Sequence, residues 1–152
     1  MAGCKNANVK VMRRLVVPVN GSPSDQDALE LACIVARRQR ARVEAVFVIQ
    51  VKRSLPLDAD MSIEIEHGEE VLDRAEQTGT RMEVEIETSL LQARDVGAAI
   101  VDEAAQAQAD AIVLGLPYRK RFGEFEIGDT ATYVMKNAPC RVWIVRAPMD
   151  EQ

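Results

Sequence analysis

Short apolar runs that alternate with amphipathic segments most limit the folds open to this chain. Leu15 to Val19 is a β-branched run without polar alternation, which is typical of a strand covered on both faces. Beyond it, apolar residues recur at spacings of three and four from Ala28 to Ala36, which predicts a helix with one buried face, ending near Arg40. Continued along the chain, this alternation predicts five strands and four helices, and therefore a parallel sheet flanked by helices.

The other expected elements follow the same alternation. A second strand is expected at 43–49, and Pro56 predicts an irregular connection after it. Gly79 suits the C-cap of the acidic helix that follows, and Asp95 suits the N-cap of the next helix. The remaining expected segments are a half-exposed, alternating strand at 82–87, a strand at 111–114, a helix from 128–130 to 137–139, and a last strand at 140–145.

Composition predicts one soluble domain. A chain of 152 residues with 47% hydrophobic content suits a single core, which we place at 13–147 between loose segments at 1–12 and 148–152. The net charge of −5 argues against a nucleic-acid-binding surface, since such binding needs dense Lys and Arg. No apolar stretch approaches the roughly 20 residues that span a bilayer, and no metal-ligand spacing occurs. A cytoplasmic protein that is not embedded in a membrane is expected.

Two glycines point to an anion-binding loop. Gly115 ends the strand at 111–114, and Gly128 precedes Asp129 and Thr130 at the expected helix start. Glycines in these places let backbone N–H groups converge on an anion, and the helix dipole adds positive potential. A phosphate is therefore expected here, with the basic run 119–121 nearby to neutralise it.

The same residues resemble the nucleotide loop of the universal stress proteins, Gly-x2-Gly-x9-Gly-(Ser/Thr), with Gly115, Tyr118, Gly128 and Asp129 in its four positions. The segment from Leu15 to Ser22 is similar to the first strand and turn of that family, which usually ends Asp-Gly-Ser, and Asn137-Ala138-Pro139-Cys140 also matches. The resemblance runs from about Arg14 to Arg146. It implies a three-layer α/β/α sandwich of the adenine-nucleotide α-hydrolase type, with the five parallel strands in the order 3-2-1-4-5.

The resemblance also implies a site between the first and fourth strands, where the strand order reverses. In nucleotide-binding members, the aspartate after strand 1 contacts the nucleoside, the glycine loop wraps the phosphates, and the Ser/Thr after the last glycine binds them. The implied ligand is ATP or AMP, with or without Mg²⁺. The nucleotide-binding residues expected here are Pro18, Val19, Asn20, Gly21, Ser22, Gly115, Tyr118, Arg119, Arg121, Gly128, Asp129 and Thr130.

Three of these positions depart from the family pattern. Asn20 replaces aspartate and keeps its hydrogen-bonding capacity. Tyr118 replaces glycine, and it either obstructs the approach of backbone to phosphate or stacks on a base. Asp129 replaces Ser/Thr; its carboxylate can accept the N–H groups that a phosphate would use, and its charge repels phosphate. Thr130 offers a substitute hydroxyl one position later.

Two functions from different classes remain in competition. The first is a universal stress protein that signals through a bound adenine nucleotide, with no enzymatic activity beyond very slow ATP hydrolysis. The second is a dimeric interaction module that binds no nucleotide. An apolar strand at the sheet edge predicts a homodimer through Arg141, Val142, Trp143, Ile144 and Val145, the pairing common in the family. Ser54 to Asp58 resembles stress-protein domains fused to amino-acid permeases, which implies a membrane transporter as a partner.

Overall fold

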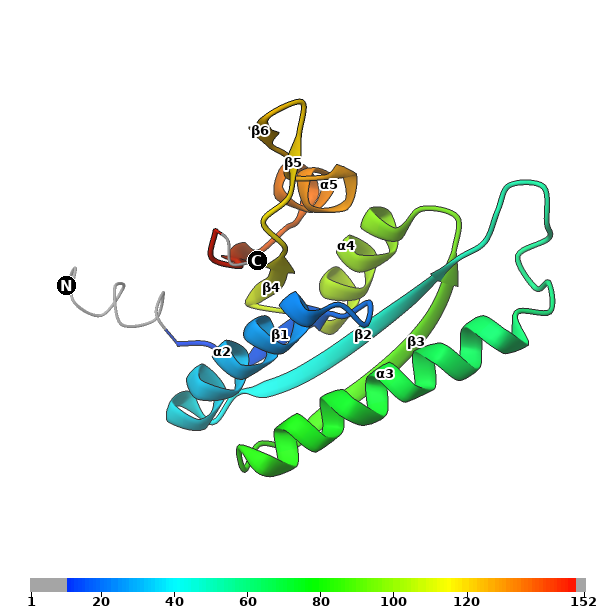
Figure 1. Cartoon of the computed structure of the whole chain (residues 1–152). Helices are drawn as coiled ribbons and strands as arrows, with labels where there is room; N and C mark the ends of the chain where they lie inside the picture. Colours follow the sequence, from blue (N-terminus) through cyan, green and yellow to red (C-terminus); the bar gives the residue numbers. More distant parts are fainter. Residues whose placement is uncertain (1–10, 150–152) are drawn as a thin grey trace.

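A computed structural model describes residues 11–149 and shows a parallel sheet between two layers of helices (Figure 1). The order of the strands is β3-β2-β1-β4-β7, as expected from the resemblance. The strands are β1 (Arg14–Pro18), β2 (Arg42–Gln50), β3 (Ile86–Ala93), β4 (Ala111–Leu116) and β7 (Arg141–Arg146). The helices are α2 (Pro23–Gln39), α3 (Ser62–Arg81), α4 (Val96–Ala107) and α5 (Asp129–Asn137).

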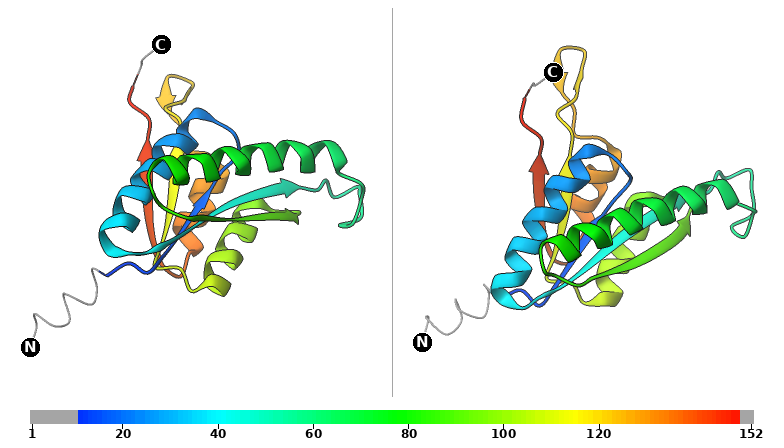
Figure 2. Two further views of the ribbon diagram at one scale, coloured as in Figure 1. Left: turned by 90° about the horizontal axis from the view of Figure 1, so that it is seen from below. Right: turned by 60° about the horizontal axis from the view of Figure 1, so that its bottom comes forward.

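Alternation along β1 sends side chains into two separate cores. Leu15 and Val17 pack with the apolar faces of α2 and α3, whereas Val16 packs with α4 and α5. Figure 2 shows the two helix pairs on opposite sides of the sheet. These contacts explain why the strand at 14–18 carries no polar alternation, because both of its faces are buried.

The packed region begins by residue 12. Met12 is buried in the core beside α2, and its N–H donates to Gln39 Oε1 at 2.5 Å. Of the segments expected to be loose, residues 1–10 and 150–152 lie outside the described residues. In the described part of the chain, no helix is long and apolar enough to cross a membrane.

The prediction for the third strand was wrong in its position. Residues 82–85 form the end of α3 and the connection after it, and the strand itself, β3, begins at Ile86 and runs to Ala93, so only the last two of the predicted strand residues belong to it. The Val84 N–H donates to the Gly79 carbonyl at 2.8 Å and the Glu83 N–H to the Thr80 carbonyl at 3.1 Å, the two bonds of a Schellman motif. Glu83 takes the left-handed position with φ +63°, and Gly79 lies inside α3 instead of capping it. The alternating pattern at 82–85 did not produce a strand, because these residues supply the hydrogen bonds that end the 20-residue helix α3.

A small hairpin, which the sequence pattern did not predict, interrupts the chain between β4 and α5. Its strands are β5 (Lys120–Arg121) and β6 (Glu124–Phe125), and they pair antiparallel. Phe122 and Gly123 join them with φ values of +55° and +80°, which is the signature of a type I′ turn. The hairpin extends beyond the carboxyl end of β4 (Figure 2), so the basic run 119–121 is part of an ordered ribbon.

Candidate functional site

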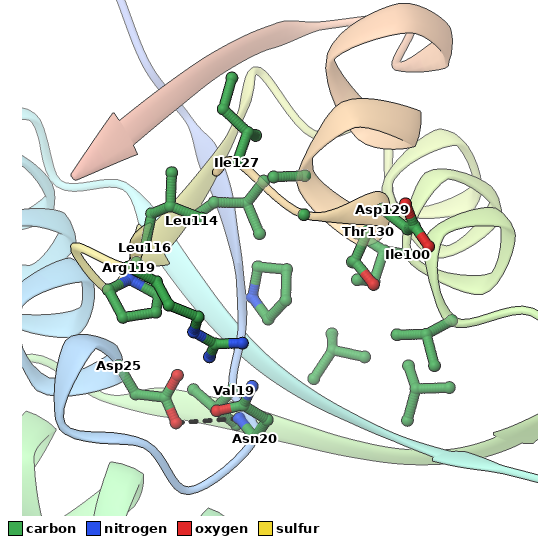
Figure 3. A pocket seen from close by; sticks show the side chains of 18 of the residues that line it. Val19, Asn20, Asp25, Ile100, Leu114, Leu116, Arg119, Ile127, Asp129 and Thr130 are labelled. Atoms are coloured by element: carbon green, nitrogen blue, oxygen red, sulfur yellow. Dashed lines mark hydrogen bonds between the residues drawn. The ribbon is translucent and has the colours of Figure 1, made fainter. Parts of the chain in front are cut away.

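The carboxyl ends of β1 and β4 open into a cavity of about 280 Å³, where the order of the strands reverses (Figure 3). Its polar lining comes from the loop after β1, the segment after β4 and the start of α5. Eight of the twelve predicted nucleotide-binding residues line it: Pro18, Val19, Asn20, Gly115, Arg119, Gly128, Asp129 and Thr130. The fold therefore brings together two loops that lie about a hundred residues apart in the sequence.

A buried carboxylate shapes the loop between β1 and α2. Asp25 is 9% exposed and accepts hydrogen bonds from the N–H groups of Asn20 at 2.8 Å and Gly21 at 2.6 Å. Burial raises the pKa of Asp25, and these hydrogen bonds act in the opposite direction. The Ser22 N–H donates to Asn20 Oδ1 at 3.0 Å. The side-chain NH2 group of Asn20 therefore stays available to donate to a ligand. Gly21 and Ser22 do not line the cavity, because they belong to the far side of this loop.

Gly115 allows helix α2 to approach β4 closely. A Cβ atom at this position would lie 2.1 Å from the Ser24 carbonyl oxygen and 2.7 Å from its carbon. Backbone atoms cannot yield as a flexible side chain does, so only glycine fits here. Gly115 thus has a packing role that is independent of any phosphate, although it also lines the cavity.

The start of α5 presents unpaired backbone donors. Gly128 is the N-cap residue with φ +95°, and a Cβ added to it would meet nothing within 4 Å. No side chain caps this helix, and no hydrogen bond of Asp129 is found among residues 11–149. The first N–H groups of a helix lack partners within the helix. Asp129 therefore does not occupy them as a cap, and they remain available at the cavity wall.

Arg119 is the cation that the structure brings to the cavity. Its guanidinium points inward on the side of Asn20 and Asp25, across from Thr130 (Figure 3). The ion pairs found within the described region do not include Arg119. One cationic side chain is thus available inside the cavity, across from the start of α5.

Tyr118 and Arg121, by contrast, do not line the cavity. The Tyr118 ring stacks on Phe125 with centroids 5.3 Å apart, and the Arg146 guanidinium lies 4.9 Å from the Tyr118 centroid. Arg121 Nη1 lies 3.5 Å from Glu126 Oε2. Tyr118 therefore neither closes nor lines the site, and both side chains stabilise the hairpin.

Sequence reasoning missed the apolar wall of the cavity. Val46 and Val48 contribute to it from β2, Val96 and Ile100 from α4, and Leu114 from β4. The sequence did hold a signal for two of these residues. Val46 and Val48 lie two positions apart near the carboxyl end of the strand that neighbours β1, so their side chains face the same side of the sheet. Asp25, Leu116, Pro117, Glu126, Ile127 and Ala131 also line the cavity and were not predicted.

A family model for universal stress proteins matches residues 12–146, which span the whole sheet and every wall of the cavity. The chain belongs to the universal stress protein family. Within this universal stress protein, the described residues contain no group of three or more His, Cys, Asp or Glu side chains that could hold a metal ion.

Relatives resemble this universal stress protein over nearly its full length. A curated universal stress protein of Methanocaldococcus jannaschii is 30% identical over 145 residues, covering 91% of this chain and 85% of that protein. A solved universal stress protein from Archaeoglobus fulgidus has a TM-score of 0.77 at 25% identity, covering 88% of this chain and 98% of that one. Another solved structure from Archaeoglobus fulgidus is a universal stress protein in complex with dAMP, with a TM-score of 0.72, 23% identity, and coverage of 89% and 98%.

Proposed function

We propose that this universal stress protein binds an adenine nucleotide in the cavity at the switch point and works as a ligand-responsive signalling module. The observation that carries the proposal is that one cavity combines an apolar wall with hydrogen-bond donors. Val46, Val48 and Ile100 form an apolar wall suited to a planar base. Arg119 and the open start of α5, on two sides of the same cavity, provide donors suited to a phosphate.

The size of the cavity supports a ligand of this class. About 280 Å³ is close to the lower end of the range of small-molecule sites, roughly 300 to 1,000 Å³. The Archaeoglobus fulgidus relative solved with dAMP has the same fold, which makes adenine nucleotides the first ligands to test. ATP and AMP are titrated into the protein by calorimetry with and without Mg²⁺, after any co-purified nucleotide has been removed by denaturation and refolding.

Two arginines of the same basic run provide a matched test. Arg119→Ala removes the cation of the cavity, so we expect the dissociation constant for AMP to rise by about tenfold, as for a lost charge-assisted hydrogen bond. Arg121→Ala removes an equal charge from the hairpin outside the cavity and should change the dissociation constant by less than about twofold. Equal weakening by both variants would show that the charge acts at long range, and indifference to both would place the ligand elsewhere.

A second candidate function, a dimeric interaction module, is favoured by the exposed edge of the sheet. Among residues 11–149, β7 pairs with β4 and with no other strand, and the side chains of its apolar residues are half-buried. Such an edge offers unpaired backbone groups to another strand. We propose that two copies pair through Arg141–Arg146, which is compatible with nucleotide binding, because β7 does not line the cavity.

A further inference from the structure

The lining of the cavity carries more negative than positive charge. Among the residues that line it are three acids, Asp25, Glu126 and Asp129, and one base, Arg119. The acids come from three different elements: the first turn of α2, the segment after β6, and the first turn of α5. A site that selects multiply charged phosphates would be expected to show the opposite balance.

The three carboxylates differ in how far their charges are compensated. Asp25 accepts two backbone N–H groups, and Glu126 lies 3.5 Å from the Arg121 guanidinium. Asp129 has neither a hydrogen bond nor an ion pair among residues 11–149. Its charge therefore acts on whatever reaches the start of α5, where the free N–H groups would otherwise attract an anion.

We propose that the cavity selects adenosine ligands that carry at most one negative charge, the nucleoside or a cyclic phosphodiester, over AMP and ATP. This inference rests on the proposed binding of an adenine ligand in the cavity and specifies the charge that the ligand carries. The 5′-hydroxyl of adenosine can donate to a carboxylate, whereas the ionised 5′-phosphate of AMP offers acceptors alone and carries more negative charge than a cyclic phosphodiester. The apolar wall formed by Val46, Val48 and Ile100 serves the base equally well in every one of these ligands. Any preference among these ligands therefore comes from the charged residues of the cavity.

The experiment is a calorimetric titration with adenosine, 3′,5′-cyclic AMP, AMP and ATP at one ionic strength without Mg²⁺. We expect adenosine and cyclic AMP to bind at least about tenfold more tightly than AMP, and ATP to bind most weakly, because each added charge meets the field of Asp129. Raising the salt concentration should narrow the gap between AMP and adenosine, since screening weakens repulsion at an exposed group.

The variant Asp129→Asn removes the negative charge and keeps the shape of the side chain, so it tests the effect of the charge alone. In this variant AMP should bind about five- to tenfold more tightly while the dissociation constant for adenosine stays within about twofold. Asp73→Asn, which removes an exposed charge from α3 outside the cavity, is the matched control and should leave both constants unchanged.

The outcomes separate this inference from the proposed function. Tightest binding of ATP or AMP by the unmodified protein would overturn the selectivity and leave adenine-nucleotide binding intact. An unchanged ratio between AMP and adenosine in Asp129→Asn would also overturn it. Failure of all four ligands to bind at millimolar concentration would overturn the proposed function together with the inference.

Discussion

At the scale of single residues, the Glu44 carboxylate lies between the sheet and α4, where burial disfavours its charged form. Glu44 lies on β2 on the same face as Val46, and it accepts a hydrogen bond from Ser89 Oγ at 2.6 Å. Burial, together with the nearby Glu103 carboxylate of α4, raises the pKa of Glu44 to about 7. A negative charge on Glu44 beside an apolar core and a second carboxylate is costly, so Glu44 keeps its proton to a higher pH than an exposed glutamate does.

This raised pKa predicts a pH-dependent free energy of unfolding. The folded protein holds the Glu44 proton more tightly than the unfolded chain, so the stabilisation is complete below pH about 4.5 and is lost as the pH rises through about 7. Because Glu44 is partly exposed, solvent screening reduces the loss to about 1 kcal/mol. Urea unfolding at a series of pH values measures it. Glu44→Gln should abolish this decline, and Glu69→Gln, an exposed residue of α3, controls for net charge.

A decline of equal size in Glu44→Gln and in the unmodified protein would contradict the assignment. The amide of the variant can still accept from Ser89 Oγ and can donate to Glu103, so packing is preserved. Any dependence of the free energy of unfolding on pH that remains in the variant would then come from other titratable groups.

At the scale of elements, three of the four helices are followed by a left-handed residue that is not the glycine such a conformation favours. Arg40, Glu83 and Gln108 follow α2, α3 and α4 in the left-handed conformation, with φ values between +55° and +63°. At the end of α4, the Gln108 N–H donates to the Ala105 carbonyl and the Ala109 N–H to the Ala104 carbonyl, which completes a Schellman motif. These ends are strained by about 1 kcal/mol each relative to glycine.

Replacement of Gln108 should therefore stabilise the protein. Gln108→Gly is expected to raise the free energy of unfolding by about 1 kcal/mol, since glycine adopts a positive φ without steric cost. Gln106→Gly, an exposed residue two positions earlier inside α4, should lower it by about 1 kcal/mol. Denaturant unfolding compares the two, and changes of the same sign would refute this account of the helix end.

At the scale of the whole molecule, the open edge at β7 decides how copies assemble. The Arg141 N–H donates to Asp110 and the Ala147 N–H to Leu116, so odd-numbered N–H groups point toward β4. Alternation along a strand then directs the N–H groups of Val142 and Ile144 outward. In a dimer with a two-fold axis, these N–H groups would donate to the outward-facing carbonyl groups of the same strand in the other copy.

A proline at the outward-facing position tests the dimer without breaking the sheet. Val142→Pro removes one outward N–H from each copy and should raise the dimer dissociation constant by about tenfold, whereas Val142→Thr keeps the N–H and should not. Light scattering at micromolar concentration measures the mass. A monomeric unmodified protein under these conditions would refute pairing through this edge.

Much of the fold was predictable from the sequence because periodicity is a local property. The apolar run 15–19 indicated a doubly covered strand, and the spacing from Ala28 to Ala36 indicated a helix. The glycines at 115 and 128 marked the two ends of the segment between β4 and α5 that borders the cavity. Strict alternation of strands and helices was enough to predict a parallel layered fold, since such crossovers allow few arrangements.

Other features depended on contacts between distant segments, which no local pattern encodes. Packing of α2 against β4 gave Gly115 its role, and stacking on Phe125 turned Tyr118 away from the cavity. The sequence by itself determined the order of the elements and the location of the loops, through hydrophobic periodicity and backbone permissiveness. Only the tertiary structure decided which side chains meet, that Asp129 leaves the helix start open, and that acids outnumber bases there, because these depend on how the layers pack.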